Sequence, residues 1–345
     1  MKQIISLFSG CGGLDLGFEQ AHFQPIIAYD LFHAAVDTYN SNRNKKLAIQ
    51  ADLSKLTAKK IIRQIEKRQI EHSVIGVIGG PPCQAFSRGN VYPKPQDIRR
   101  ELPIHYAKIL KELNKKYNLH FFVFENVEGL TLNRHKEEFE QIRNLFEIAG
   151  FKLFAKTLNA RDYGVPQERS RVFLVGLNNT MYPDKEFIFP KPILGQDLTV
   201  QDAFEDAFGA PPWPEPAFYN SNLKPEDIPY HPNHWTMVPR SPKFKDGKLL
   251  NSDANRRSFK VLNWDKPSAT VAYGNREIHV HPSGTRRLSL YEALMLQGFP
   301  KNYILKGNLS EQVKMVSDAV PPPMAFHLAS SISEFLDTNW VNDQF

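Results

Sequence analysis

The first 175 residues alternate between short apolar runs and longer stretches in which apolar side chains recur at helical spacing. Five runs rich in Ile, Val and Phe predict buried strands at residues 4–8, 26–29, 74–78, 121–124 and 172–175. Predicted helices cover residues 14–21, 104–117, 136–149 (closed by Gly150), 288–297 and 323–336. The strand–helix alternation predicts an α/β fold with a doubly wound, mostly parallel sheet.

The sequence changes in character after Leu177. Twelve of the 25 prolines lie between Pro183 and Pro242, where hydrophobic periodicity is lost. From Arg240 to Lys260 there are seven Lys or Arg residues against two acidic ones. We therefore expect a smaller, loop-rich domain with a basic face, although a solvated linker would have the same composition. The net charge of +6 favours an anionic partner such as nucleic acid.

The composition excludes several classes of protein. The 345 residues contain no run of eighteen apolar side chains and no signal-peptide pattern, so we expect neither a membrane span nor secretion. Two cysteines cannot build a disulfide framework, which predicts a cytoplasmic protein with free thiols. No metal site is expected, because the pairs His231/His234 and His279/His281 lack further ligands nearby in the sequence.

The first apolar run leads into a glycine cluster, FSGCGG, at residues 8–13. Such glycines let the backbone turn tightly and approach a ligand at the carboxyl edge of a sheet. Asp15 stands where a dinucleotide fingerprint requires glycine, which argues against a dehydrogenase. Asp30 follows Gly10 by 20 residues, where an acid binds ribose hydroxyls, and Asp52 would face an adenine. These residues predict a nucleoside-containing cofactor; the alternative is a tight turn beside a solvent-facing acid.

A second loop, GGPPCQAFS, occupies residues 79–87 after the third apolar run. Its two prolines fix their φ angles and stiffen a loop that presents Cys83 beyond the sheet edge. A structural cysteine more often lies within an apolar run, so Cys83 is a candidate nucleophile. We interpret Cys11, in the glycine cluster, as a packing residue.

A carboxylate and two guanidinium groups complete the candidate site. Glu125 follows the apolar run at residues 121–124, where partial burial would raise its pKa and help it to remain protonated. In QERSR, strand alternation places Arg169 and Arg171 on one face. These groups would orient a polar ring beside the thiolate, although both arginines would equally fit as surface charges.

With these motifs, the chain resembles the DNA (cytosine-5) methyltransferases, especially the stand-alone enzymes of bacterial restriction–modification systems. The ordered blocks that carry the resemblance are SLFSGCGGLDLGF, GGPPCQAFS, FENV, QERSRVF, RRLSLYEALMLQGFP and SDAVPPPMA. The resemblance implies a Rossmann-like, S-adenosylmethionine-dependent catalytic domain formed by residues 1–177 and 271–345. The loop-rich residues 178–270 would be the target-recognition domain.

The resemblance also assigns roles to residues. Cys83 would be the nucleophile, Glu125 would bind the cytosine edge, and Arg169 and Arg171 would support it. The S-adenosylmethionine pocket would be lined by Phe8, Gly10, Gly12, Asp30, Asp52, Leu53, Pro82, Leu102, Asp318 and Val320. Relatives often have tryptophan where this chain has Leu31, so adenine stacking would fall to Phe32. Relatives usually have Gly-Asn where this chain has Ser317-Asp318.

The implied reaction transfers a methyl group to carbon 5 of a cytosine flipped out of a specific double-stranded DNA sequence, through a covalent Cys83 adduct. Candidate DNA-binding residues are Arg88, Arg240, Lys243, Arg256 and Arg257. We expect a monomer without membrane contact, in the cytoplasm of a prokaryotic cell and nucleoid-associated when bound to DNA. It would act beside a cognate restriction endonuclease that cuts the same site.

Two other readings stay open at this point. A tRNA cytosine-5 methyltransferase would share the Cys-Glu-Arg constellation, but the long basic module before Thr270 favours duplex DNA. A catalytically inactive binding protein is the second alternative. The intact Cys83 and Glu125 argue against it, because binding alone needs no thiol.

Overall fold

The computed structural model describes residues 2–68, 74–82, 100–195, 197–218, 220, 222–236, 260–270 and 279–340. The strands of its main sheet are β1 (Lys2–Leu7), β2 (Phe23–Asp30), β3 (Ala48–Gln50), β4 (Val74–Gly79), β5 (Phe121–Val127), β6 (Phe151–Asn159) and β8 (Ser170–Asn178). The helices are α1 (Gly13–Gln20), α2 (His33–Ser41), α3 (Ala58–Lys67), α4 (Leu102–Tyr117), α5 (Lys136–Ile148), α6 (Val200–Phe208), α7 (Leu290–Met295), α8 (Leu309–Asp318) and α9 (Pro322–Asn339). Short strands are β7 (Gln167–Glu168), β9 (Ala217–Phe218), β10 (Trp235–Thr236), β11 (Lys260–Val261), β12 (Ser268–Ala269) and β13 (His279–Val280).

The predicted doubly wound, mostly parallel sheet is confirmed. Its strand order is β3-β2-β1-β4-β5-β8-β6, and the strands from β3 to β5 run parallel. Only β8 runs antiparallel to its two neighbours, β5 and β6. The carboxyl ends of β1, β2, β4 and β5 therefore meet the amino end of β8 at one edge, where α/β proteins bind ligands.

Helices cover both faces of this sheet because alternate strand residues point to opposite sides. Phe122 and Phe124 pack in a cluster with α3, α4 and α5, while Phe121 and Val123 pack in another with α1 and α9. Gly150 has a φ of +98°, a conformation favourable for glycine, and ends α5 as predicted.

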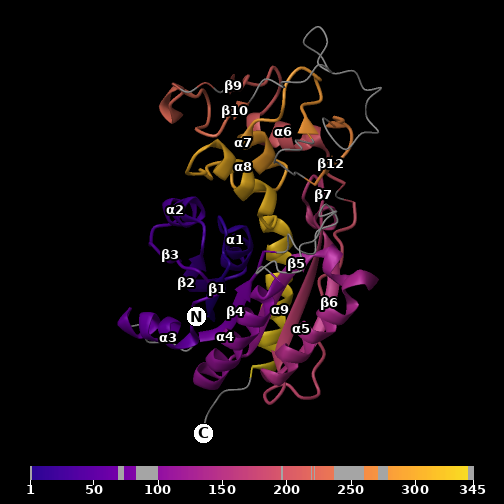
Figure 1. Cartoon of the computed structure of the whole chain (residues 1–345). Helices are drawn as coiled ribbons and strands as arrows, with labels where there is room; N and C mark the ends of the chain where they lie inside the picture. Colours follow the sequence, from indigo (N-terminus) through magenta and orange to yellow (C-terminus); the bar gives the residue numbers. More distant parts are fainter. Residues whose placement is uncertain are drawn as a thin grey trace.

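A second group of elements lies beyond the carboxyl edge of the sheet, at the upper end of Figure 1. It contains α6, α7 and α8 with β9 and β10, and its core includes Phe204, Trp235 and Leu294. Helix α9 runs from this group back along the sheet (Figure 1). Tyr182 and Phe187, just after β8, belong to the same apolar cluster as Phe121, α1 and α9, on one face of the main sheet. The domain limits at residues 178 and 270 stay a prediction.

None of the helices in the described part of the chain is long and apolar enough to cross a membrane.

Candidate active site

A cavity of about 470 Å³ lies at the carboxyl edge of the sheet, a size typical of small-molecule sites. Its lining includes Phe8, Gly10, Cys11, Asp15, Asp30, Phe32, Gly80, Pro82, Glu125, Arg171, Thr270, Lys314, Asp318 and Val320. Several residues that the sequence assigned to a cofactor therefore share one cavity with Glu125 and Arg171, which it assigned to catalysis. The segment after α8 also lines the cavity and lies against the glycine cluster, since a Cβ on Gly13 would be 2.2 Å from the Val320 carbonyl oxygen.

The glycine cluster and Asp30 are joined directly. The Gly10 N–H donates to Asp30 Oδ2 at 2.8 Å, and the Phe32 N–H donates to Asp30 Oδ1 at 2.8 Å. Burial raises the pKa of Asp30, although both amide donors favour its charged form. Each carboxylate oxygen keeps a lone pair that can accept from a ribose hydroxyl. The tight turn that the glycines predicted therefore also holds the Asp30 carboxylate in place, through the Gly10 amide.

The residues beside Asp30 divide as the sequence suggested. Phe32 lines the cavity, whereas the Leu31 residue is 60% exposed. Phe32 and Phe8 are thus the aromatic rings that line the cavity. Asp15 also lines the cavity, and burial raises its pKa to about 6.

Four predicted cofactor residues lie outside the lining of this cavity, and each has another role in the structure. Gly12 caps α1 with a φ of +91°, and a Cβ there would meet the Tyr39 ring at 2.9 Å. Asp52 accepts from the hydroxyl of Ser54 at 2.6 Å. Leu53 is buried in the core, and Leu102 begins α4.

Glu125 and Arg171 form an ion pair at the cavity, with Arg171 Nε 3.0 Å from Glu125 Oε1. Glu125 pairs across the ladder with Phe173, and Arg171 lies two residues away on the same strand. Diagonal neighbours on one face of an antiparallel pair are within reach of long side chains, so the direction of β8 produces this contact. Burial raises the pKa of Glu125, and the Arg171 and Arg169 guanidinium groups oppose that rise. A carboxyl that holds a proton more readily than usual suits hydrogen bonding to a ring nitrogen.

The loop that leads to Cys83 is held against this pair. The Asn126 side-chain amide donates to the Pro81 carbonyl at 3.3 Å, and Asn126 is 1% exposed. A Cβ on Gly80 would lie 2.4 Å from Glu125 Oε2, so the backbone approaches the carboxylate too closely for any side chain. Cys83 itself lies outside the described residues.

For the methyl transfer that the sequence motifs imply, Gly80→Ala is expected to lower kcat about 10- to 100-fold, because the added methyl group displaces the Glu125 carboxylate. The dissociation constant for S-adenosylhomocysteine should change little, which single-turnover kinetics and calorimetry can separate. Gly195→Ala is the control for activity: its φ of +79° strains an alanine locally, but the added Cβ meets no described atom within 4 Å and Gly195 lies outside the cavity lining. Equal rates for the two variants would contradict this account of Gly80.

Arg169 does not line the cavity; it lies fully buried behind it. Its Nη2 donates to the Ser317 carbonyl at 2.8 Å, at the end of α8. The two carbonyls that precede Ser317 also accept from side chains. Gln297 Nε2 donates to the Val316 carbonyl at 2.6 Å, and Cys11 Sγ donates to the Met315 carbonyl at 3.8 Å.

Three segments far apart in the sequence thus hold the last turn of α8 through its carbonyls, of which Met315 also accepts from the Ala319 N–H at 3.0 Å. That turn carries two charged side chains at the cavity, Lys314 and Asp318, which form an ion pair with each other. Cys11 packs as predicted and, in addition, contributes to this attachment.

Gln297→Met is expected to weaken binding of S-adenosylhomocysteine, the product of the cofactor that the motifs imply, about tenfold, because the fully buried Val316 carbonyl loses its side-chain donor while the side-chain volume is kept. Isothermal titration calorimetry measures the effect. Gln201→Met, in which an exposed glutamine of α6 is replaced, is the matched control. Unchanged affinity in Gln297→Met would show that this hydrogen bond does not support the cavity.

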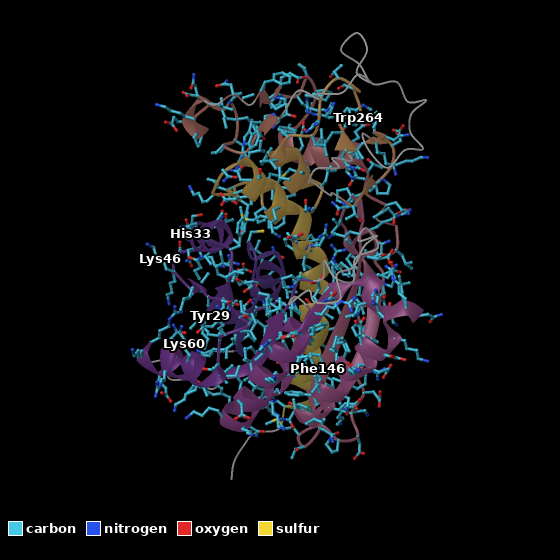
Figure 2. All side chains as sticks on the ribbon, in the orientation of Figure 1. Tyr29, His33, Lys46, Lys60, Phe146 and Trp264 are labelled. Carbon is cyan, nitrogen blue, oxygen red and sulfur yellow. The ribbon has the colours of Figure 1, made fainter. Side chains whose placement is uncertain are left out.

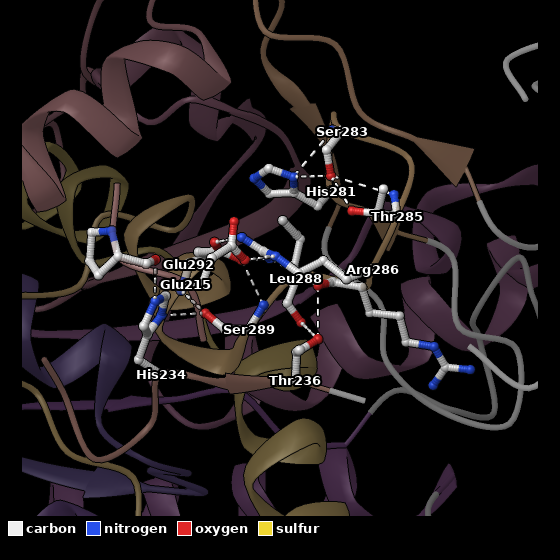
Figure 3. A network of polar contacts seen from close by, with 12 residues as sticks. Glu215, His234, Thr236, His281, Ser283, Thr285, Arg286, Leu288, Ser289 and Glu292 are labelled. Carbon is white, nitrogen blue, oxygen red and sulfur yellow. Dashed lines mark hydrogen bonds and ion pairs between the residues drawn. The ribbon is translucent and has the colours of Figure 1, made fainter. Parts of the chain in front are cut away.

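Within the upper group of elements, a polar network joins α7 to the segments that carry Arg286 and Glu215 (Figure 3). Arg286 Nη2 lies 2.8 Å from Glu292 Oε1, and Arg286 Nε lies 3.1 Å from Glu215 Oε2. Burial opposes ionisation of Glu292, but Arg286 outweighs it and lowers the pKa of that carboxyl to about 2. His281 lies beside the network, and burial lowers its pKa to about 4. Burial lowers the pKa of His231 to about 4 as well.

Stability should therefore fall as the pH drops from about 6.5 towards 4. A histidine with a lowered folded pKa binds fewer protons than the unfolded chain in this window, so protonation favours unfolding. At about 1.4 kcal/mol per pH unit, His231 and His281 each contribute up to roughly 3 kcal/mol to the loss. Urea unfolding of His281→Asn across this range should show a weaker pH dependence than that of the wild type. His33→Asn, at an exposed ion pair, should behave like the wild type.

The DNA contacts predicted from the sequence cannot be placed. Arg88, Arg240, Lys243, Arg256 and Arg257 all lie outside the described residues. The segment that follows them returns to the site at Thr270, whose hydroxyl donates to the Glu168 carbonyl at 2.7 Å. There β12 pairs with β7, next to Arg169.

Sequence reasoning missed Gly80, Asn126, Lys314 and Gln297. Gly80 and Asn126 belong to the GGPPC and FENV motifs, in which Cys83 and Glu125 had attracted attention. Only the structure shows that Gly80 lets the backbone approach Glu125 and that Asn126 binds the Pro81 carbonyl. Lys314 precedes Asp318 by one helical turn, so spacing on a predicted α8 would have paired the two side chains. No local signal indicates the contact between Gln297 and Val316.

A glycine turn, an acid after the second strand and a shared cavity define an α/β enzyme that binds a nucleoside-containing cofactor. A family model for the C-5 cytosine-specific DNA methylases matches residues 2–334. The chain is 33% identical over 355 residues to Type II methyltransferase M.MthTI of Methanothermobacter thermautotrophicus, covering 97% of this chain and 98% of that one. It is 30% identical over 361 residues to Type II methyltransferase M.NgoPII of Neisseria gonorrhoeae, covering 97% and 96%.

In fold it is similar to the Schizosaccharomyces pombe Dnmt2 methyltransferase, with a TM-score of 0.61 and 18% identity over 99% of this chain and 100% of that one. The chain belongs to the family of C-5 cytosine-specific DNA methylases, which use S-adenosylmethionine as methyl donor. The family resemblance inferred from the motifs is thereby confirmed.

Proposed function

We propose that this protein methylates carbon 5 of a cytosine that is flipped out of a specific double-stranded DNA sequence, through a covalent adduct with Cys83. The observation that carries the proposal is the Glu125–Arg171 pair, which lies in the same cavity as the Asp30 carboxylate. One cavity can then hold a nucleoside cofactor at Asp30 and a polar base at Glu125. Names of relatives as Type II methyltransferases support a role in protecting host DNA beside a cognate endonuclease.

The cavity suits S-adenosylmethionine. Asp30, supported by two backbone amides, would bind the ribose hydroxyls, and Phe32 would contact the adenine. Phe8, Gly10, Pro82 and Val320 supply the surrounding walls, and Asp318 faces the same space. When bound, S-adenosylmethionine supplies an electrophilic methyl group on a sulfonium. Four predicted residues would support this pocket from outside its lining: Gly12, Asp52, Leu53 and Leu102.

In this proposal the Cys83 thiolate forms a bond to carbon 6 of the cytosine, and the electrons of the ring double bond move to carbon 5. Protonated Glu125 donates to the ring nitrogen and accepts from the amino group, which stabilises the charge that develops. Arg171 orients Glu125, and Arg169 keeps the end of α8 in place. Carbon 5 is then nucleophilic toward the methyl group. Loss of its proton to a base and departure of the Cys83 thiolate restore the double bond and release 5-methylcytosine.

The target base must leave the DNA stack, because a duplex hides carbon 6. Arg88, in the segment that follows Cys83, would contact a phosphate of the DNA. The basic stretch that contains Arg240, Lys243, Arg256 and Arg257 would bind the duplex from the other side. One flipped base per molecule suits a monomer that works on chromosomal DNA in the cytoplasm.

The direct test incubates the protein with methyl-labelled S-adenosylmethionine and either unmethylated genomic DNA or bulk tRNA. We expect label at carbon 5 of cytosine in DNA and none with Cys83→Ala. Bisulfite sequencing of the product then identifies the target sequence. Label in tRNA alone would overturn the DNA substrate, and label in neither would overturn the enzyme.

A further inference from the structure

The helices α3 and α4 carry a concentration of positive charge that the proposed reaction does not use. Each contains four Lys or Arg residues and one Glu. Together they have a formal charge of +6, which equals the net charge of the whole chain. The remaining residues therefore sum to zero, because acidic residues elsewhere offset the basic stretch Arg240–Lys260. We call these two helices the α3–α4 surface.

The charged side chains of this surface point into solvent. Lys59, Arg63 and Lys67 are exposed and recur every four residues, which places them on one stripe of α3. On α4, Lys115 and Lys116 form ion pairs with Glu112 at 2.7 Å and Glu66 at 3.7 Å. These two pairs use both acids of the surface.

Six cations of the α3–α4 surface have no carboxylate within 4.0 Å among the residues that the structure describes; they are Lys59, Lys60, Arg63, Lys67, Lys108 and Lys111. Neighbouring unpaired cations repel one another, and an anionic partner relieves that repulsion. An open groove of about 600 Å³ separates the two helices. Its charged lining consists of four cations, Lys59, Arg63, Lys115 and Lys116, and the two acids Glu66 and Glu112.

This surface is separate from the active site. None of its eight cations lines the cavity at the carboxyl edge of the sheet. Figure 2 shows Lys60 at the opposite end of the molecule from Trp264, which belongs to the upper elements. A ligand at the α3–α4 surface is therefore different from the base in the cavity.

We infer that the α3–α4 surface binds the phosphate backbone of duplex DNA outside the target site. The family acts on DNA, a polyanion that carries one charge per roughly 1.7 Å of helix axis. The long, unpaired cations on two neighbouring helices can contact several phosphates without reading any base. Each phosphate contact releases counterions, so the surface would hold the enzyme on non-target or flanking DNA and keep it near its sites.

The test compares two triple variants of the full chain that lose equal charge. The first replaces Lys59, Arg63 and Lys67 with glutamine, which is also a good helix former. The control replaces Lys156, Lys185 and Lys191 with glutamine; these exposed lysines lie outside the α3–α4 surface and make no ion pair within the described structure. Binding to a 40-base-pair non-target duplex is measured by fluorescence anisotropy between 50 and 200 mM salt.

We expect the first variant to bind the non-target duplex at least tenfold more weakly at low salt. The slope of log affinity against log salt should fall in magnitude by about 2 to 3, since each lost phosphate contact removes about 0.9. Methylation of a short target duplex should stay at the wild-type rate in both variants. That readout separates failure of this inference from failure of the proposed function.

Equal losses in the two variants would show a general charge effect and overturn the inference. Wild-type salt slopes in the first variant would also overturn it and leave an acidic protein as the partner to seek. Circular dichroism of the first variant should match the wild type, because exposed substitutions usually change stability by less than about 0.5 kcal/mol.

Discussion

Arg171→Met should reduce the methylation rate by about 10²- to 10³-fold. Both partners of the Glu125–Arg171 pair are largely buried, with side-chain exposures of 10% and 13%. Removing one member of such a pair leaves an uncompensated charge, at a cost of roughly 3–5 kcal/mol. Glu125 is the group that would bind the cytosine. Without Arg171, both the orientation and the ionisation of Glu125 would change.

The pH dependence of this variant tests the same point independently. Burial raises the pKa of Glu125 and Arg171 opposes the rise, so removing Arg171 should raise that pKa further. If the protonated carboxyl is the active form, the rate falls as the pH rises through its pKa. That falling limb should then move to higher pH in Arg171→Met, as measured by single-turnover kinetics.

Two further variants bracket the result. Arg171→Lys keeps the charge but loses the planar geometry of the guanidinium, so it should recover only part of the rate. Arg134→Met removes an exposed arginine that does not line the cavity and should leave the rate unchanged. A rate for Arg171→Met within threefold of the wild type would show that the ion pair is structural only.

Asp30→Ala should weaken S-adenosylhomocysteine binding by 100-fold or more. The alanine removes the acceptor for the ribose and also leaves the Gly10 and Phe32 amides without their carboxylate. Each buried donor that loses its partner costs about 1–3 kcal/mol. The loop that shapes the cavity would lose its support together with its ligand contact.

Thermal shift with increasing S-adenosylhomocysteine measures this loss, because a ligand stabilises the folded state according to its affinity. Asp30→Asn keeps the shape but has only one acceptor oxygen for two amides, so an intermediate affinity is expected. Asp37→Ala, on the exposed face of α2, is the matched control. Wild-type ligand stabilisation in Asp30→Ala would remove Asp30 from the proposed site.

Much of the fold could be predicted because its signals are local. The five predicted strands all exist, as β1, β2, β4, β5 and β8, and each of the five predicted helices overlaps an observed one. β6 was missed because it alternates poorly: its exposed residues include Lys156, and it lies at the sheet edge. α6 was missed within the proline-rich region, and α8 was missed although Asn308 caps it in a capping box with Glu311.

The candidate site was predictable in composition but not in geometry. Motif spacing brought Asp30, Glu125 and Arg171 to one edge, and the structure places all three in one cavity. Strand alternation predicted that Arg169 and Arg171 lie on one face and together orient one polar ring. In the structure they separate: Arg171 binds Glu125, while Arg169 binds the end of α8.

The sequence by itself determined what short-range chemistry can specify. Glycines that permit a turn, prolines that stiffen a loop and apolar runs that form buried strands act within a few residues. The direction of β8 and the partners of α8 were decided only by tertiary structure. Arg169 reaches a carbonyl 148 residues away, and Cys11 reaches one 304 residues away. Such contacts follow from how the elements pack together, because no local pattern encodes which distant backbone a side chain will meet.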